Sequence, residues 1–447
     1  MRHPRRQTRL IYKSYRARSV LRILPPAQLY YWFPTPVTTA ELLAAHTFRL
    51  ERWRAGADGI LATAAQTFLL LIAVQYYAAG PTAKALLASG GSIGMLLSLL
   101  VVSMVANSGL RPARVAAMLL SLGAVTMGVV AAIPTPTVFV AGSITAMALL
   151  AMTIPLLTQV YQDNYPGHSR GRLFSLTMMI RIGSAAAFAA AAGRVLAADM
   201  QWNRWLLLVY SGAFAFSAVC LLRHESKPLT RSGHASPLRA LRLVREDRIF
   251  RLNLIVWMLM GFANLMMAPM RVEFLANPRY GPPLAATSIA LLTGVIPNIV
   301  KLLLSPLWGR LFDRMEFLSM RATLNLSFAL GILAFFTSRE MPGLLAGAVI
   351  FGIAMAGGEL AWSLWVTKFS PPERVAEYMS VHTFFTGLRG VGAPLVAFNL
   401  LTYISIGALS WVCAAMIVAA SLILVAEVRG RKAADPGTTL IEEATRP

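Results

Sequence analysis

The sequence has few of the residues that metal sites, thiol chemistry and acid–base catalysis require. Its 447 residues include only 2 cysteines and 6 histidines, and 19 acidic residues stand against 41 basic ones. The cysteines, Cys220 and Cys413, lie in apolar segments far apart in the chain, without metal-ligand spacing. No Walker A, metal-ligand or dinucleotide motif is present, and no nucleophile or acid/base pair stands out. We therefore expect no bound metal, no cofactor and no enzymatic activity.

Charged residues of either sign are scarce, whereas apolar residues are abundant. Only 13% of the residues are charged and 57% are apolar, with a mean hydropathy of +0.61. This composition is typical of a membrane protein. The alternating pattern of a membrane β-barrel is absent, so segments that cross lipid must be helices, which satisfy their own backbone hydrogen bonds. Most apolar segments are long enough to cross about 30 Å of hydrocarbon. The apolar segments lie at about residues 58–79, 84–107, 112–132, 137–160, 173–197, 203–222, 252–276, 284–308, 319–337, 342–367, 376–402 and 404–427.

The basic residues are distributed unevenly between the two sides of this predicted topology. The formal net charge is +22, and placing the N-terminus in the cytoplasm puts 32 of the 41 Lys and Arg residues on the cytoplasmic side. This bias follows the positive-inside rule and predicts that both termini are cytoplasmic in a multi-pass protein of the cell inner (plasma) membrane. The positive charge then sets topology and contacts anionic lipid headgroups, so we expect no nucleic-acid partner.

The chain divides into two halves joined by a basic connector. We expect a basic cytoplasmic tail over 1–57, a six-helix bundle over 58–222, a cytoplasmic connector over 223–251, a second six-helix bundle over 252–427 and a cytoplasmic tail over 428–447. The capping-box spacing of Thr38 and Glu41 predicts a short helix within the first tail. In the connector, Ser236 begins an amphipathic stretch that predicts a helix on the inner leaflet.

The two halves are related by an internal repeat of about 205 residues. Residues 103–108 close the second apolar segment, and residues 309–314 close the eighth. Ser175 and Ser380 occupy matching places at the starts of the fifth and eleventh segments. We therefore predict an all-α membrane protein with twelve transmembrane helices in two pseudo-symmetric six-helix bundles, and a cavity between the bundles.

The residues between the eighth and ninth segments carry a resemblance to a known family. Gly309, Asp313 and Arg314 stand in the order Gly-x-x-x-Asp-Arg. With the twelve segments and the repeat, this resembles the major facilitator superfamily, as does the stretch 371–390. The later Gly and Arg residues of the family element are missing here, and Asn107 and Ser108 replace Asp and Arg in the first half. The resemblance implies secondary transport of a small-molecule substrate along helices 1, 2, 4, 5, 7, 8, 10 and 11.

The same element predicts a gate between the bundles. By symmetry, Asp313 is expected near the start of the fifth helix, where Arg170 and Arg172 lie. Ion pairing there would hold the cytoplasmic side closed, together with Gly309 and Arg314 of the motif. The alternative is that Asp313 only caps the ninth helix or pairs with Arg314.

Four charged residues are predicted inside the membrane helices. These residues are Arg181, Lys301, Glu359 and Arg389. A charge in hydrocarbon costs about 2.5–3.5 kcal/mol on insertion scales, so such residues usually face the bundle interior. Three bases against one acid favour an anionic solute. The alternatives are snorkelling of Arg181 and Lys301 to the membrane surface, and a structural salt bridge of Glu359 with Lys301 or Arg389.

Several neutral or titratable side chains complete the candidate site. His382 precedes Arg389 by seven residues on the same helical face and is a candidate carrier of a coupling proton. A hydrogen-bonded packing role is the alternative for this histidine. Gln66, Asn264 and Asn298 are candidates for hydrogen bonds to substrate, or for contacts between helices.

These observations predict a secondary active transporter that moves a small polar, anionic solute by alternating access. Membrane lipids, the solute and a proton as candidate coupling ion are the expected partners, and a monomer is the expected state. One alternative is a drug or multidrug exporter, which favours a more apolar, aromatic cavity. Another is a transporter-fold sensor or assembly protein without transport, which the altered motif of the first half and the 57-residue basic tail leave open.

Overall fold

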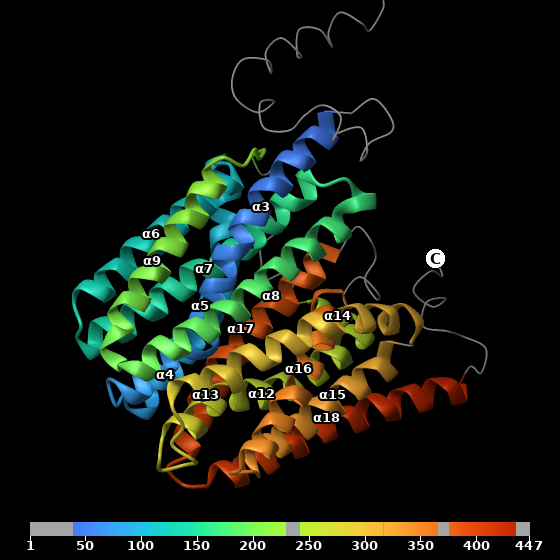
Figure 1. Ribbon diagram of the computed structural model, residues 1–447. Coiled ribbons are helices and arrows are strands. Elements are labelled where there is room, and N and C mark those ends of the chain that lie inside the picture. Colours follow the sequence, from blue (N-terminus) through green and yellow to red (C-terminus); the bar gives the residue numbers. More distant parts are fainter. Residues whose placement is uncertain (1–38, 229–241, 316, 365–374, 435–447) are drawn as a thin grey trace, which may run out of the picture.

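The chain folds into long helices arranged in two groups, as Figure 1 shows. The structure is a computed structural model and describes residues 39–228, 242–315, 317–364 and 375–434. Within these ranges no strand occurs. The first group contains a continuous unit of α3 (Thr39–Thr63), the π-helical η1 (Ala64–Phe68) and α4 (Leu69–Gln75), then α5 (Pro81–Ser108), α6 (Pro112–Ala132), α7 (Pro136–Asn164), α8 (Gly167–Ala198) and α9 (Asn203–Leu222). The second contains α12 (Arg248–Ala276), a continuous unit of α13 (Ala286–Ala290), the π-helical η3 (Leu291–Val295) and α14 (Ile296–Arg314), then α15 (Phe317–Phe336), α16 (Met341–Leu364), α17 (Val375–Leu400) and α18 (Ile406–Ala434).

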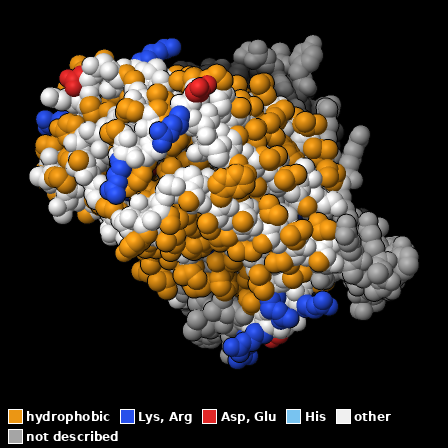
Figure 2. Space-filling model, turned by 90° about the horizontal axis from the view of Figure 1, so that it is seen from below, with side chains coloured by type: hydrophobic (Ala, Val, Ile, Leu, Met, Phe, Trp, Pro, Cys, Tyr) orange, Lys and Arg blue, Asp and Glu red, His pale blue; other side chains and the backbone are white. Residues whose placement is uncertain are grey.

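The expected all-α membrane fold is confirmed. Eleven of the helical units are long and apolar enough to cross a membrane. The remaining unit, α17, has 26 residues and contacts α5 and α12. Figure 2 shows hydrophobic side chains over much of one face, with Lys and Arg toward its edges. This distribution suits a protein surrounded by lipid, because the apolar surface faces hydrocarbon and the charges reach the headgroups.

The ends of the helices follow from local sequence. Helices α5, α6 and α7 begin at a proline, where its missing N–H costs nothing and its fixed φ favours the helix. Asp247 caps α12 by accepting a hydrogen bond from the backbone N–H of Phe250 at 2.8 Å. Gly109 ends α5 with a φ of 69°, a left-handed conformation that residues with a Cβ rarely adopt.

The first helix begins much earlier than the apolar pattern predicts. It starts at Thr39, not at about residue 58, and its candidate membrane span, Glu41–Gln75, has 35 residues. Such a helix is about 50 Å long and exceeds the hydrocarbon thickness, so its first turns project beyond it. The short helix predicted around Glu41 is therefore the beginning of the first membrane helix. The connector helix predicted from Ser236 lies outside the described residues.

The two bundles meet along a small set of helices. Helix α5 contacts α17, and α8 contacts α13, η3 and α14. The first unit also reaches the second bundle, because α4 contacts α12 and η1 contacts η3. In Figure 1, α8 and α17 lie in the middle of the molecule, between the two groups. Each contact joins helices from different halves of the repeat, as expected of two pseudo-symmetric bundles.

Candidate functional site

The molecule has two ends that differ in how the bundles meet. We call the end with the starts of α3, α6 and α8 the basic end, because most of the basic residues were predicted there. The opposite end contains residues 76–80, 277–285 and 401–405.

A buried ion pair joins the bundles near the opposite end. Lys84 of α5 donates to the carboxylate of Glu273 on α12, and Glu273 has no solvent exposure. The side-chain amide of Asn277 also donates to Glu273, at 2.7 Å. The Lys84 Nζ atom lies 5.5 Å from the centroid of the Phe398 ring on α17. Helices from both bundles thus enclose one pair of opposite charges.

Neutral hydrogen bonds continue this contact along the interface. The hydroxyls of Thr67 in η1 and Thr293 in η3 lie 3.0 Å apart. The Ser89 hydroxyl of α5 donates to the Val391 carbonyl at 3.4 Å, and the Thr287 hydroxyl donates to the Gly193 carbonyl at 3.2 Å. A π-helical turn frequently marks a functional site in a helix. Here two such turns, one from each bundle, face each other.

The interface is closed at the opposite end. Five hydrogen bonds between described residues of the two bundles lie in that half. In the other half, Leu100 and Met104 of α5 and Leu303 and Leu307 of α14 are exposed. These bonds join the bundles at the opposite end.

Two of the predicted charged residues pair with each other. Lys301 of α14 donates to Glu359 of α16, within the second bundle. The Glu359 side chain is 40% exposed, whereas that of Lys301 is 8% exposed. Of the two salt bridges considered for Glu359, the structure forms the one with Lys301.

Arg389 is buried without a carboxylate partner. The residue is 6% exposed, and its Nη1 donates to the backbone carbonyl of Trp257 on α12. Gly261 makes room for it, since a Cβ at that position would overlap the guanidinium. Its Nε has no hydrogen-bond partner among the described residues. Arg181, by contrast, is exposed on α8, where its nearest polar contact is the Met178 sulfur at 3.9 Å.

The other predicted site residues are not brought together. His382 is buried between the rings of Trp257 and Trp362, each 5.7 Å away between centroids. Asn298 donates to the Gly294 carbonyl of its own helix at 2.8 Å. Gln66 is exposed in η1, and Asn264 is half-buried on α12. These positions keep their candidate roles as predictions.

The predicted gate falls on side chains that the structure does not describe. The backbones of Gly309, Asp313 and Arg314 belong to α14, and those of Arg170 and Arg172 belong to α8. The side chains of all five lie outside the described set. Their pairing therefore stays a prediction.

Sequence reasoning missed Arg321 and a charged network in the first helix. Arg321 was not among the four charged residues predicted inside the membrane helices, but it lies in α15 and is 1% exposed. In α3, Arg54 donates to Glu51 at 2.8 and 2.7 Å and to Asp58 at 2.6 Å. It also donates to the hydroxyl of Tyr161 on α7 at 2.8 Å. We call these four residues the Arg54 network. Their i, i+3 and i+4 spacing on one helix is the sequence signal that could have identified it.

His224, just after α9, is the pH-sensitive neighbour of this network. Its Nε2 lies 3.3 Å from Glu51 Oε1, but burial lowers the pKa of His224 to about 4 and keeps it neutral. Unfolded histidine titrates near 6.5, so the unfolded chain binds more protons between these values. The contribution of His224 to the free energy of unfolding is therefore fully present above about pH 6.5. It falls by about 3 kcal/mol as the pH is lowered to about 4.

We therefore expect His224→Gln to weaken the acid sensitivity of the protein. Melting temperatures of wild type and variant, measured from pH 7 to pH 4, should diverge most at the acid end. The variant should lose less stability, because a neutral amide takes up no proton. Parallel curves for the two proteins would contradict this account.

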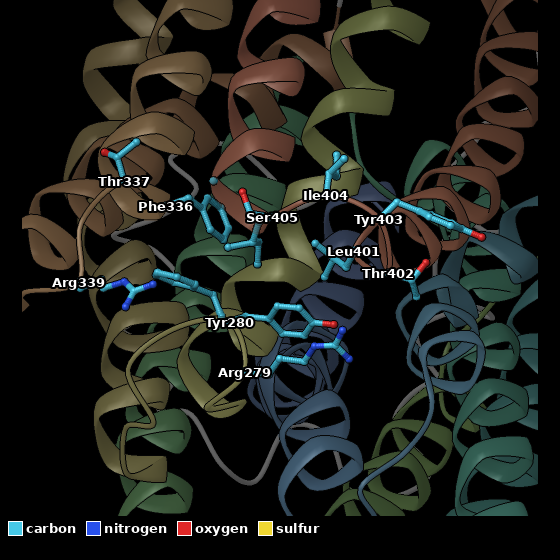
Figure 3. Close-up of a pocket in the computed structure, with 13 residues that line it drawn as sticks. Arg279, Tyr280, Phe336, Thr337, Arg339, Leu401, Thr402, Tyr403, Ile404 and Ser405 are labelled. Atoms are coloured by element: carbon cyan, nitrogen blue, oxygen red, sulfur yellow. The ribbon is translucent and has the colours of Figure 1, made fainter.

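A separate pocket lies at the opposite end of the second bundle. It has a volume of about 410 Å³ and is lined by residues at and just after the ends of α12, α15 and α17, and by the first residues of α18. Figure 3 shows Arg279, Tyr280, Arg339 and Tyr403 around it. No residue predicted from the sequence lines this pocket. The described residues also contain no group of His, Cys, Asp and Glu that could hold a metal ion.

Comparisons with known proteins agree with this architecture. The family model described as Major Facilitator Superfamily matches residues 280–447. The nucleoside transporter NupG has a TM-score of 0.68 at 15% identity, covering 86% of this chain and 99% of its own. A D-xylose–proton symporter has a TM-score of 0.60 at 16% identity, covering 86% and 96%. The xylose transporter XylE from E. coli, in a partially occluded inward-open conformation, has a TM-score of 0.60 at 16% identity, covering 86% and 95%. A comparison with curated proteins found no match.

Proposed function

We propose that the chain is a member of the major facilitator superfamily and, rather than an enzyme, a secondary active transporter of a small polar, anionic solute. The family model over residues 280–447 and the fold shared with the nucleoside transporter NupG support this proposal. The described part of the chain is that of a multi-pass membrane protein. Alternating access is the proposed mechanism, in which the interface opens at one end while the other is closed. The ion pair of Lys84 with Glu273 supports this mechanism, because it joins the bundles at one end.

The burial of Arg389 without a carboxylate partner in the described part of the chain is the main support for an anionic solute. Its guanidinium is buried on α17, a helix of the bundle interface, and meets no carboxylate among the described residues. Arginine stays protonated under physiological conditions, and its planar fork suits bidentate binding of carboxylate or phosphate. The pairing of Lys301 with Glu359 satisfies the acid that could otherwise have neutralised Arg389.

The distribution of basic residues also supports an orientation in the membrane. The basic end faces the cytoplasm of a cell inner (plasma) membrane, and both termini lie there, because basic residues concentrate on that side. Anionic lipid headgroups contact this end, and the protein acts as a monomer. A proton is the proposed coupling ion, by analogy with the similar fold named as a D-xylose–proton symporter.

The rival functions are a drug exporter and a transporter-fold sensor. A drug exporter favours a solute site of aromatic and apolar side chains, and Trp257 and Trp362 beside His382 are its best support. The buried guanidinium of Arg389 argues against it, because an apolar solute would leave that charge without a partner. A sensor would bind the solute without moving it, which transport in liposomes distinguishes.

The test is the effect of Arg389→Lys on solute binding. A melting screen of the purified protein against metabolite classes identifies the ligand, since binding to the folded state raises the melting temperature. Arg389→Lys should retain the fold and charge but lose about tenfold to a hundredfold in affinity, because charge-assisted hydrogen bonds contribute about 1.5–3 kcal/mol. Liposome uptake should fall in parallel.

Arg204→Lys is the matched control, since Arg204 is exposed on α9, away from the interface. It should bind like wild type. Unchanged affinity in both Arg389→Lys and Arg389→Ala would remove this arginine from the site. Binding of only neutral, apolar compounds would favour the exporter instead.

A further inference from the structure

Two buried guanidiniums share one aromatic ring inside the second bundle. The Cζ atom of Arg321 lies 3.8 Å from the centroid of the Trp257 ring, and the Cζ atom of Arg389 lies 5.9 Å from it. Because both distances are measured from the same centroid, the two Cζ atoms are no more than 9.7 Å apart. We call Arg321, Arg389 and Trp257 the arginine–tryptophan cluster.

The charges of this cluster are not balanced by the described residues. Both terminal nitrogens of Arg321 and the Nε of Arg389 are buried without hydrogen-bond partners. Each guanidinium also repels the other, since the charge of Arg389 acts on Arg321. Three described acids of this bundle have partners elsewhere: Glu273 pairs with Lys84, Glu359 pairs with Lys301, and Asp247 accepts from the Phe250 N–H and the Tyr378 hydroxyl. Both guanidiniums remain charged, and stacking on one ring does not replace a counter-ion.

An asparagine one turn from Arg321 adds neutral hydrogen-bonding groups. Asn325 is fully buried, and neither its amide nitrogen nor its oxygen has a partner among the described residues. Its position four residues after Arg321 places the two on the same face of α15. A buried amide without partners is unusual, because such groups nearly always form a hydrogen bond. The donors of Asn325 and Arg321 thus stand together in the bundle core.

We propose that Arg321, Arg389 and Asn325 form a binding site for a small oxyanion with two negative charges, of the phosphate or dicarboxylate class. An oxyanion between two guanidiniums has its central atom roughly 4 Å from each Cζ, which is compatible with their separation. Two negative charges match the two unpaired positive charges, whereas a monoanion would leave one of them uncompensated. Arg389 places the site next to the interface, because α17 contacts α5.

The proposal deepens the proposed function by giving the charge class of the solute, and rests on that function only for transport. The site itself is a property of the purified protein. The bound dianion could be the transported solute or a resident inorganic ion. The role of Arg321 distinguishes this site from the one in the proposed function, because a monocarboxylate bound by Arg389 alone would not require Arg321.

Calorimetry with inorganic phosphate and succinate as probes, and chloride and acetate for comparison, tests the charge class. We expect the two dianions to bind at least about tenfold more tightly than the monoanions. Arg321→Gln should weaken the dianions by about tenfold or more and bring them close to the monoanions. Equal affinity for both charge classes, or wild-type phosphate binding in Arg321→Gln, would overturn the proposal.

Asn325→Asp is a second variant that should fold at least as well as wild type. It supplies a built-in carboxylate beside Arg321, so it should raise the melting temperature without anion and reduce the further rise given by phosphate. Asn399→Asp, at an exposed position of α17, is the matched control and should leave both values unchanged. A lower melting temperature for Asn325→Asp with wild-type phosphate binding would contradict the site.

Counterflow of labelled phosphate or succinate in liposomes separates the two sources of the anion. Exchange shows that the dianion is the solute, and its loss in Arg321→Gln supports the proposal. Binding without exchange supports the site as that of a resident anion and contradicts only its part in transport. Transport of a different solute with no dianion binding would overturn the dianion site while leaving the proposed function intact.

Discussion

Glu273→Gln is expected to destabilise the closed interface by about 3–5 kcal/mol, because it leaves Lys84 buried without its counter-ion. The neutral hydrogen bonds of Thr67 with Thr293 and of Ser89 with Val391 are then too few to hold that end closed. A cysteine placed at position 89, buried in the interface, should react faster with a thiol reagent in the variant. The melting temperature should fall in parallel.

Replacing both members of the pair should have the opposite effect. Lys84→Met with Glu273→Met removes both buried charges, and such replacements are often neutral or stabilising. The double variant should melt like wild type, keep position 89 protected and transport slowly, because opening would expose apolar side chains to water. Lys301→Met is the control, since the Lys301–Glu359 pair lies within one bundle. It should lower stability without raising reactivity at position 89, and a rise there would contradict a gate specific to Lys84 and Glu273.

The fold could be predicted from the sequence because its signal is local. Each apolar run is a property of consecutive residues, and lipid permits only helices for such runs. The pairing of the two bundles through equivalent helices followed from the repeat. The pair of Lys301 with Glu359 was one of two alternatives, because both residues lie at similar depth on helices expected to face inward.

The sequence predictions were wrong where charged residues are buried by contacts with other side chains inside the protein. The start of the first membrane helix was placed nearly 20 residues late because Glu51 and Arg54 were assigned to the basic cytoplasmic tail, whereas in α3 they pair with each other and Arg54 pairs with Asp58. Arg321 was missed as a buried charge because its burial depends on the Trp257 ring of a different helix. No pattern of neighbouring residues indicates such a contact.

The ion pair of Lys84 with Glu273 could not have been found by local reasoning either. Lys84 and Glu273 are 189 positions apart in the chain, and each lies near a helix end, where a charge normally reaches water. Their burial depends on how the two bundles dock. Sequence patterns predict helices and their inward faces, but the partner of a charged side chain is decided by tertiary contact.

Arg54→Met should be the most damaging single substitution in the first bundle. Arg54 donates to both oxygens of Glu51, to Asp58 and to Tyr161, and its removal leaves two largely buried carboxylates close to each other without a cation. Breaking a buried pair costs about 3–5 kcal/mol, and repulsion between like charges adds to this. We expect a large fall in melting temperature at neutral pH, measured on the protein in detergent.

Neutralising the carboxylates of Glu51 and Asp58 in the Arg54→Met background should then restore stability. The triple variant Arg54→Met, Glu51→Gln, Asp58→Asn has no ion left in the Arg54 network, so it should recover most of the lost melting temperature. It should not recover the hydrogen bonds that Arg54 made to Tyr161 and the acids. Arg52→Met is the control, because Arg52 is exposed two residues away and contacts only the face of Phe48 in the described structure, at 5.4 Å. It should melt close to wild type, since a surface cation–π contact contributes about 0.5–1 kcal/mol. A triple variant no more stable than Arg54→Met would show that packing of the arginine side chain, and not the balance of charge, holds the first helix in place.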